Sequence, residues 1–223
     1  VMMSAPFTGA PPLLENKTTK LTRPTLDQLD KELSELKEPR KHYQTYFSSP
    51  TANVELMNSS QGIHQFLRAY YHHKSADWSD NQPFTLTSWD AKIMAQMPTY
   101  YIMHHGQTMP ETVASEMPNE KQIKSCEWLT ELELQVYASE YSKNTFQGGL
   151  QWYRCATEGI NQPALSLFAG QRILVPTLFL SGKNDWGIYQ TPGAMEHMRD
   201  QVCASMEGIV LVDQAGHWVQ QEQ

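Results

Sequence analysis

Two residues near the end of the chain, Asp185 and His217, have the types and positions that acid–base chemistry requires. Asp185 follows the apolar stretch ILVPTLFLSG (173–182), and His217 follows GIVLVDQ (208–214) and an Ala-Gly turn. Each apolar stretch predicts a strand that is buried on both faces. A carboxylate on one nitrogen of an imidazole fixes its tautomer and leaves the other nitrogen free to act as a general base.

The segment between these stretches predicts how the two side chains are positioned. GAMEHMRDQV (193–202) has apolar residues at helical spacing, so the order is strand, helix, strand, as in a parallel crossover unit. The carboxyl ends of adjacent parallel strands lie about 4.8 Å apart, which lets Asp185 and His217 meet. Spacing alone leaves an alternative open, in which Asp185 caps a turn and His217 is a surface histidine.

The first 165 residues predict a different organisation. Val1 to Ala5 is a short apolar stretch that ends in a Pro/Gly turn and favours a strand. The segment 25–37 has leucines three and four apart and predicts an amphipathic helix, which Thr25 can cap with Gln28 three residues on. Residues 40–165 are rich in aromatics and broken by prolines, without an alternating stretch. They predict a helical insert, with candidate helices at 63–73, 111–116 and 127–142.

Composition excludes several classes of protein. The 223 residues carry a net charge of −7 and an isoelectric point near 5.6, which argues against nucleic acid or an anionic membrane as main partner. Three widely spaced cysteines are typical of reduced thiols, so we expect a cytoplasmic protein. The histidine pairs His72–His73 and His104–His105 lack the spacing of zinc ligands. No metal or cofactor is therefore expected.

Four stretches of the chain resemble the epoxide hydrolases of the α/β-hydrolase fold superfamily. VMMSAPFTGAPP at the start is similar to the strand and loop before the cap of these enzymes, and KHYQTYF (41–47) is similar to a cap segment with a lid tyrosine. GGLQWYR (148–154) is similar to the segment with the second lid tyrosine, and AGHWVQQEQ (215–223) to the segment with the catalytic histidine. The four stretches stand in the family's order and span nearly the whole chain.

The resemblance implies a role for each matching residue. Tyr43 and Tyr153 would hydrogen-bond the oxygen of a small apolar epoxide, His217 would activate water, and Asp185 would orient the histidine. In the family an aspartate opens the epoxide and forms an ester that this water hydrolyses. These roles are chemically reasonable, because an ether oxygen is a poor leaving group unless an acid donates a proton or a hydrogen bond to it. By residue type alone both tyrosines could be core residues. Arg154 is expected to tie the cap to the rest of the fold.

The nucleophile of this reaction has no visible counterpart. A nucleophile elbow needs small residues on both sides of the nucleophile, and no two glycines of this chain stand four apart. We therefore expect the C-terminal portion of such an enzyme, inactive by itself, with an unpaired strand edge at Val1 to Ala5. A dehalogenase, an esterase and a non-catalytic α/β-hydrolase-like fragment remain as alternatives.

The predicted architecture is α/β: the last three parallel strands of an α/β-hydrolase fold, with flanking helices and an inserted helical cap. Residues 1–14 would form a core strand and loop, 15–165 the linker and cap, and 166–223 the C-terminal part of the core.

Overall fold

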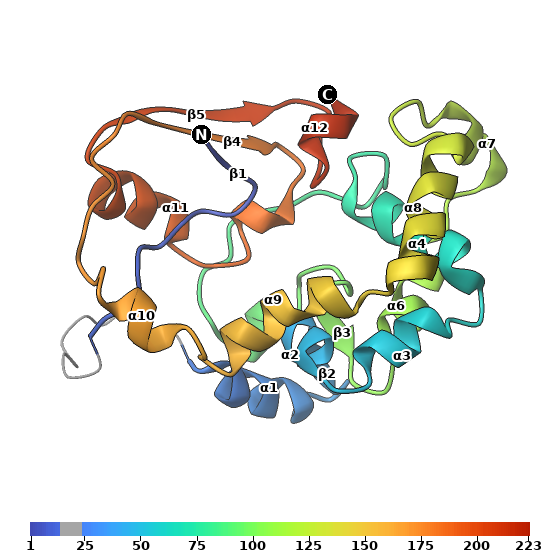
Figure 1. Cartoon of the computed structure of the whole chain (residues 1–223), viewed down its shortest axis with the longest axis horizontal. Helices are drawn as coiled ribbons and strands as arrows, with labels where there is room; N and C mark the ends of the chain where they lie inside the picture. The colour runs from blue at the N-terminus through green and yellow to red at the C-terminus, as the bar shows by residue number, and fades with distance from the viewer. Residues whose placement is uncertain (14–23) are drawn as a thin grey trace.

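The computed structural model describes residues 1–13 and 24–223. A three-stranded parallel sheet joins the two ends of the chain in the order β1-β4-β5, with β1 at Met2–Met3, β4 at Thr177–Gly182 and β5 at Met206–Val212. Met2 pairs with Phe179, which in turn pairs with Ile209, and the register between β4 and β5 shifts by one residue between Thr177 and Leu178. Figure 1 shows this sheet along one side of the molecule, with both termini on it. The predicted α/β architecture, with three parallel strands and an inserted helical module, is confirmed.

The connection from β4 to β5 is the predicted helical crossover, but it is not one regular helix. It contains the 3-10 helix η1 (Trp186–Ile188), the helix α11 (Ala194–His197) and the π-helical turn η2 (Met198–Val202). Its apolar residues pack on the sheet in a small core of Phe179, Ile188, Met198 and Cys203.

The burial predicted for the two late strands is wrong in part. The stretch 173–182 becomes a strand only from Thr177, after Pro176, and Leu174 and Val175 before it are exposed. In β5 the neighbours Val210 and Leu211, which point to opposite faces, are 43% and 39% exposed. The physical reason is that parallel strands are buried on both faces only where other elements cover them, and among the described residues the buried core on this sheet has only four residues.

A helical module, described over residues 24–166, lies between β1 and β4 in the chain. Its helices are α1 (Leu26–Ser34), α2 (Tyr43–Ser48), α3 (Ala52–Met57), α4 (Gly62–Lys74), α5 (Ala91–Met94), α6 (Met109–Ala114), α7 (Glu120–Ser125), α8 (Glu131–Asn144), α9 (Gln147–Thr157) and α10 (Gln162–Ser166). Each candidate helix of the sequence corresponds to one of these, namely α1, α4, α6 and α8. The predicted boundary after residue 14 lies outside the described residues, and the predicted boundary after residue 165 falls within α10.

Local chemistry explains the best predicted element of this module. Thr25 accepts a hydrogen bond from the backbone N–H of Gln28, whose side chain accepts one from the N–H of Thr25, so two of the free N–H groups at the start of α1 are satisfied. Leu29 and Leu33 on its apolar face are fully buried. The capping box and the leucine spacing are therefore both confirmed.

The module also contains a small sheet that the sequence pattern does not predict. Strand β2 (Arg40–His42) pairs antiparallel with β3 (Ile102–His104), far away in the chain. Three-residue strands are too short to show an alternating pattern, and only the fold brings these two together.

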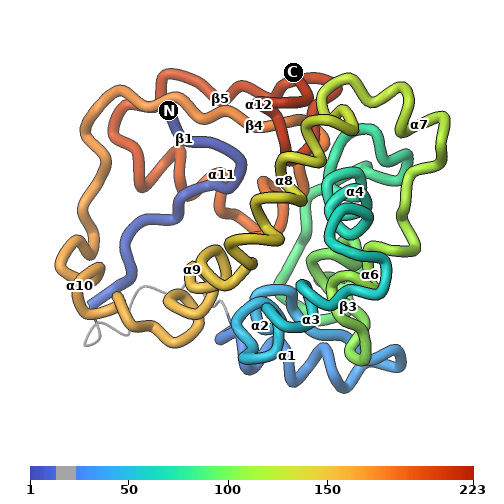
Figure 2. The backbone as a smooth tube through the Cα atoms, turned by 45° about the vertical axis from the view of Figure 1, so that its right-hand side comes forward, coloured from blue at the N-terminus to red at the C-terminus, as the bar shows by residue number. Residues whose placement is uncertain are grey.

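The helical module and the sheet meet at the end of α4. The backbone N–H of His217 donates to the carbonyl oxygen of Lys74 at 3.0 Å, and a Cβ on Gly216 would stand 2.6 Å from that same oxygen. A Cβ on Gly182 would collide with the carbonyl oxygens of Ala215 and Gly216. The chain therefore needs glycine at both positions for this close approach. Figure 2 shows the sheet and the helical module, including α4, from a second angle.

Among the described residues, no helix combines the length and the apolar character that crossing a membrane would require.

Candidate active site

Asp185 occupies the turn that follows β4, where it caps the first residues of η1. Its carboxylate is 2% exposed and accepts hydrogen bonds from the Gly187 backbone N–H at 2.7 Å, the Ser4 hydroxyl at 2.6 Å and the His217 ring at 3.0 Å. A Cβ on Gly187 would stand only 2.9 Å from the carboxylate, so glycine permits this tight cap. Asp185 thus caps a turn and also contacts His217, two roles that the sequence presents as alternatives.

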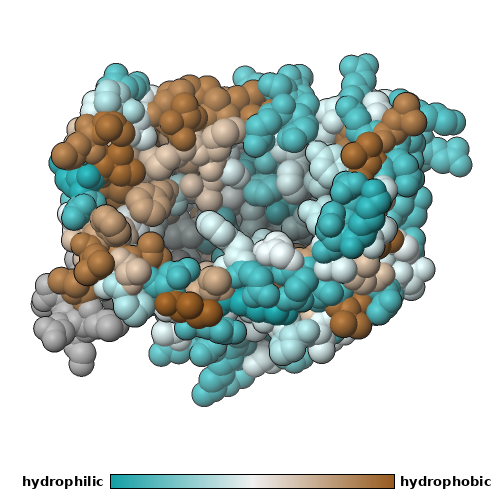
Figure 3. Space-filling model, in the orientation of Figure 1, coloured by the Kyte–Doolittle hydropathy of each residue, from teal (hydrophilic) through white to brown (hydrophobic). Residues whose placement is uncertain are grey.

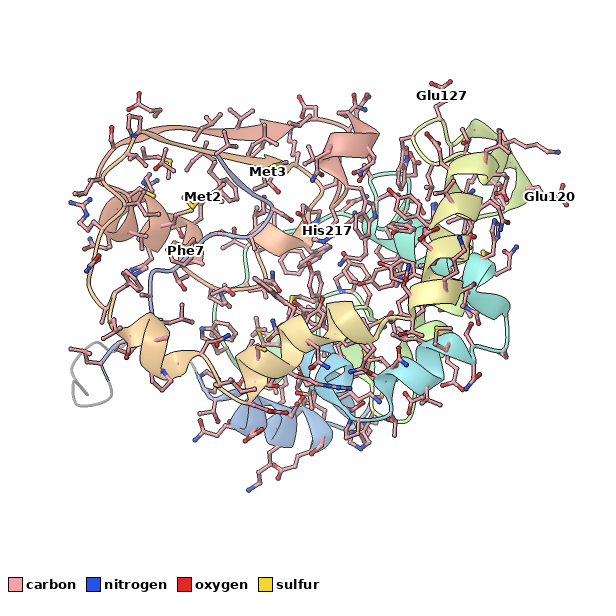
Figure 4. All side chains as sticks on the ribbon, viewed as in Figure 1. Met2, Met3, Phe7, Glu120, Glu127 and His217 are labelled. Atoms are coloured by element: carbon pink, nitrogen blue, oxygen red, sulfur yellow. The ribbon has the colours of Figure 1, made fainter. Side chains whose placement is uncertain are left out.

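His217 lies in the loop between β5 and the short terminal helix α12 (Val219–Glu222). Its Nδ1 faces Asp185 Oδ1 at 3.0 Å, and a carboxylate there assigns the proton to Nδ1 and leaves Nε2 as the free basic nitrogen. The side chain is 26% exposed and points into the space between the sheet and the helical module, as Figure 4 shows. This arrangement can remove a proton from a water molecule.

The electrostatics favour a charged aspartate beside a neutral histidine. Burial alone would raise the pKa of Asp185, but the interaction with His217 and the hydrogen bonds from His217, Ser4 and Gly187 hold that pKa below its usual value. Burial lowers the pKa of His217, the positive charge of Lys74 lowers it further, and Asp185 opposes both. His217 is therefore available as a base near neutral pH.

Ser4 is a third member of the site, and sequence reasoning missed it. Its backbone has a φ of 67°, in the left-handed region that few non-glycine residues adopt, directly after β1. In this conformation its hydroxyl donates to Asp185 and lies 3.2 Å from His217 Nδ1. The signal was present, because Ser4 ends the first strand at the same sheet edge to which Asp185 and His217 were assigned.

Glu222 is a second contributor that the sequence did not reveal. One carboxylate oxygen accepts from the N–H groups of Ala76 and Gly216, both at 2.8 Å, and the other from that of Trp218 at 2.9 Å. Burial raises the pKa of Glu222, and these three hydrogen bonds oppose the rise. Glu222 thereby holds the loop that carries His217 against the segment that follows α4.

Tyr43 and Tyr153 are brought together within the helical module. Tyr43 begins α2 and Tyr153 lies on α9, two helices that pack on each other, and their rings meet edge to face with centroids 5.9 Å apart. The Tyr43 hydroxyl lies 3.4 Å from the side-chain oxygen of Gln190, just after η1. Burial raises the pKa of Tyr153, so its hydroxyl keeps its proton at neutral pH.

A continuous aromatic cluster connects the tyrosine pair to the histidine. The ring of Tyr43 meets that of Tyr101 at 5.0 Å, and Tyr101 meets Tyr100 at 4.7 Å. The Lys74 ammonium lies over both Tyr100 and Tyr101 and also over Trp218, the neighbour of His217. Tyr100 and Tyr101 are buried in the core of the helical module.

His217 also lines a pocket of about 400 Å³. Its walls come from the end of β1, from α4, from the segment leading into α8 and from the C-terminal segment: Met3, Ser4, Tyr71, Trp128, Leu129, Tyr137, His217, Trp218, Val219, Gln220 and Gln221. Tyr43 and Tyr153 are not among these residues. The described chain therefore brings His217 and Asp185 together, and Tyr43 and Tyr153 together, as two separate pairs.

Three further predictions from the sequence concern Arg154, the cysteines and metal binding. Arg154 was expected to tie the cap to the rest of the fold, but it donates to the carbonyl oxygen of Ser49, within the helical module. Cys126, Cys155 and Cys203 are free thiols, of which only Cys203 is buried. In the described part of the chain no three histidine, cysteine or acidic side chains gather as metal ligands.

Solved structures identify the fold. An epoxide hydrolase from an endophytic Streptomyces superposes on 99% of this chain with a TM-score of 0.69 at 18% identity, and the match covers 55% of that structure. Epoxide hydrolase A from Mycobacterium thermoresistibile superposes on 96% of the chain with a TM-score of 0.59 at 26% identity, covering 56% of that structure. Both matches extend over the sheet and the helical module alike.

Sequence comparison agrees. Epoxide hydrolase A of Mycobacterium tuberculosis is 36% identical over 98 residues, which is 43% of this chain and 28% of that protein. This chain is related to the epoxide hydrolases of the α/β-hydrolase fold. Epoxide hydrolase 2 of Siraitia grosvenorii, a second such relative, is 29% identical over 126 residues, or 52% of the chain and 39% of that protein. The chain thus spans about half the length of the related solved structures, and no family model matches it.

Proposed function

We propose that this chain supplies the lid tyrosines, the orienting acid and the general base of an epoxide-opening hydrolase. The observation that carries the proposal is the coexistence of two pairs: the Asp185–His217 pair and the adjoining phenols of Tyr43 and Tyr153. A dehalogenase or an esterase would need the first pair, but not the second. The relatives named as epoxide hydrolases support this choice.

In the first proposed step, a carboxylate oxygen attacks one epoxide carbon and the carbon–oxygen bond of the ring breaks. The electron pair of that bond goes to the ring oxygen, which takes a proton from Tyr43 or Tyr153, and an ester remains. The resemblance assigns the attack to an aspartate at a nucleophile elbow, which this sequence does not contain. Tyr153 suits the task because burial raises the pKa of its hydroxyl, which therefore stays a neutral donor near neutral pH.

In the second step, Nε2 of His217 removes a proton from water and the resulting hydroxide attacks the ester carbonyl. Collapse of the tetrahedral intermediate releases the diol and restores the carboxylate, and the proton on His217 returns to the tyrosinate or to solvent. While His217 holds the proton from water, the negatively charged carboxylate of Asp185 stabilises the imidazolium through its hydrogen bond with Nδ1. Small apolar epoxides and water are the proposed substrates.

Loss of one lid hydroxyl tests the proposal, in the natural protein that carries this sequence. Tyr43→Phe and Tyr153→Phe should each lower kcat for epoxide opening by about 10- to 100-fold, because each removes a donor to the developing alkoxide. Single-turnover kinetics with styrene oxide would measure this step directly.

Tyr46→Phe is the matched control. Tyr46 lies on the same helix as Tyr43, three residues further on, and is equally buried, so the same atom is removed from the same structure. We expect its rates to stay within about twofold of wild type. Equal rates in all three variants would contradict the lid role and favour a dehalogenase or an esterase, which haloalkane and ester substrates would reveal.

A further inference from the structure

Lys74 is a buried cation at the junction of the helical module and the sheet. It ends α4 and is only 6% exposed. Its ammonium lies 5.2 to 5.4 Å from the centroids of four rings, those of Tyr70, Tyr100, Tyr101 and Trp218. Among the described residues no carboxylate lies within ion-pairing distance of it. Aromatic faces therefore provide the main compensation for removing this charge from water.

The charge persists near neutral pH in spite of its burial. Burial lowers the pKa of Lys74 to about 8, and the negative charge of Asp185 opposes that fall. At pH 7 most molecules thus hold a positive charge inside the aromatic cluster. If Lys74 only filled space, an apolar side chain of the same shape could replace it. Its positive charge instead interacts with the carboxylate of Asp185 and lowers the pKa of His217.

Two contacts link Lys74 to His217. Its carbonyl oxygen accepts the backbone N–H of His217 at 3.0 Å, which sets the position of the histidine loop. One of the four aromatic rings around the Lys74 ammonium is that of Trp218. The Trp218 ring lies edge to face with the His217 ring, with a centroid distance of 4.8 Å. The ammonium of Lys74 and the imidazole of His217 therefore both contact the ring of Trp218.

Four other ionisable groups lie around His217 or the loop that carries it. Asp185 from the turn after β4 favours the protonated imidazole, and Glu222 from α12 is occupied by three backbone N–H groups. Tyr71 from α4 and Tyr137 from α8 line the same pocket, and burial raises the pKa of Tyr71, so it adds no charge near neutral pH. Lys74 is thus the cation that opposes Asp185 at this position.

We propose that Lys74 is a positioning residue for the catalytic base, with a caged ammonium that keeps His217 neutral and a carbonyl that holds its loop. The catalytic consequence rests on the role proposed for His217 above, whereas the electrostatic coupling does not. The histidine needs Asp185 to orient its ring, but a full ion pair with Asp185 would hold a proton on Nε2 and block the base. The positive charge of Lys74 disfavours this protonation of His217, while the hydrogen bond between Asp185 and Nδ1 stays in place.

Removal of the charge tests the coupling in the purified chain. Lys74→Met keeps most of the apolar stem, and nuclear magnetic resonance with ring-labelled histidine follows the titration of His217, assigned with His217→Gln. The midpoint should rise by about 0.5 to 1 pH unit, because protonation of His217 no longer meets a nearby positive charge.

Lys41→Met is the matched control. Lys41 is a half-buried lysine on β2 whose ammonium lies 5.2 Å over the ring of Tyr46, and burial lowers its pKa as well. The same substitution therefore removes a cation from an aromatic face without touching the histidine loop. The His217 midpoint should stay within about 0.2 pH unit of wild type, a shift expected of distant screened charges. An equal midpoint in wild type and Lys74→Met would overturn the proposal.

A measurement on the unmodified chain covers the case in which Lys74→Met does not fold. The Lys74 ammonium should lose its proton near pH 8, and the resonances of the neutral His217 ring should show a second inflection at the same pH. A His217 ring that senses no titration in this range would overturn the proposal without any substitution.

Catalysis by the natural protein supplies the last readout. In Lys74→Met the acid limb of kcat/KM should move to higher pH by the same amount as the His217 midpoint, with the plateau retained within a few fold. A lower plateau with an unmoved limb would mean that Lys74 serves only structure. Should the wild type open no epoxide, the proposed function fails, and the His217 midpoint still decides the coupling.

Discussion

The helical module and the sheet differ in how far each buries its own apolar surface. In the described residues, the core of the helical module unites 24 buried apolar residues of that module with Trp186 from the β4–β5 connection, whereas the buried core on the sheet has four. Met3, Val210 and Leu211 of the sheet are all at least 39% exposed. Figure 3 shows apolar side chains gathered over the sheet, while the surface of the helical module is mostly polar.

The larger core indicates that the helical module contributes most of the stability of the described chain. A helix has one apolar stripe, and the helices of this module turn their stripes toward one another. A strand presents two faces and two edges, and in the described structure β1 and β5 each have an unpaired edge. The site lies at the boundary, since Trp186, the neighbour of Asp185, packs into the core of the helical module and meets Phe84 at 5.1 Å.

The largest expected effect compares one leucine from each region. Leu134 on α8 is fully buried, so Leu134→Ala should lower the free energy of unfolding by about 2 to 5 kcal/mol. Leu211→Ala on β5, where the side chain is 39% exposed, should cost less than about 1 kcal/mol. Urea unfolding followed by circular dichroism measures both. Equal losses would mean that the sheet is as well packed as the helical module.

The second effect is a pH dependence that originates in the helical module. His73 is buried between Trp78 and Tyr100, and burial lowers its pKa to about 3. Between that value and about 6.5 the unfolded chain binds a proton that the folded chain does not, so stability falls as the pH falls, by about 1.4 kcal/mol per pH unit. Urea unfolding at pH 7 and pH 5 should therefore differ by about 2 kcal/mol from His73 alone.

His73→Gln should remove that share of the difference. The burial of His72 and His217 lowers their pKa in the same direction, so part of the pH dependence remains. A pH dependence untouched by His73→Gln would show that the unfolding reaction does not report on the helical module.

The smallest effect on stability concerns association. Val210→Lys on β5 should change the free energy of unfolding by less than about 0.5 kcal/mol, yet reduce self-association, because a lysine on an exposed strand edge disfavours pairing with another chain. Val54→Lys on α3, where valine is 58% exposed on the helical module, is the control and should leave association unchanged. Light scattering over a range of concentrations compares the two, and equal behaviour would contradict the contrast between the regions.

Much of this organisation was predictable because its causes are local. Thr25 and Gln28 cap α1 through atoms three residues apart, and the spacing of apolar residues marks α4 as a helix. Asp185 and His217 were placed together by one rule, that parallel strands end at a common edge. The same rule applied to the first strand would have added Ser4.

Other features depend on neighbours that are distant in the chain. The pairing of β2 with β3 joins segments about 60 residues apart, and the exposure of Val210 depends on what covers β5. Arg154 finds its acceptor in Ser49, which no local pattern indicates. In each case the partner is chosen by packing, which leaves no periodic mark in the sequence.

The amino-acid sequence by itself determined the fold class, the helical insert and the residue types that can do acid–base chemistry. These follow from short-range sterics, capping and periodicity, which act within a few residues. The tertiary structure alone decided that Asp185 both caps a turn and contacts His217, and that Lys74 carries its charge into an aromatic cluster beside them. Charge and burial act through space, so only the folded chain sets the protonation state of each group at the site.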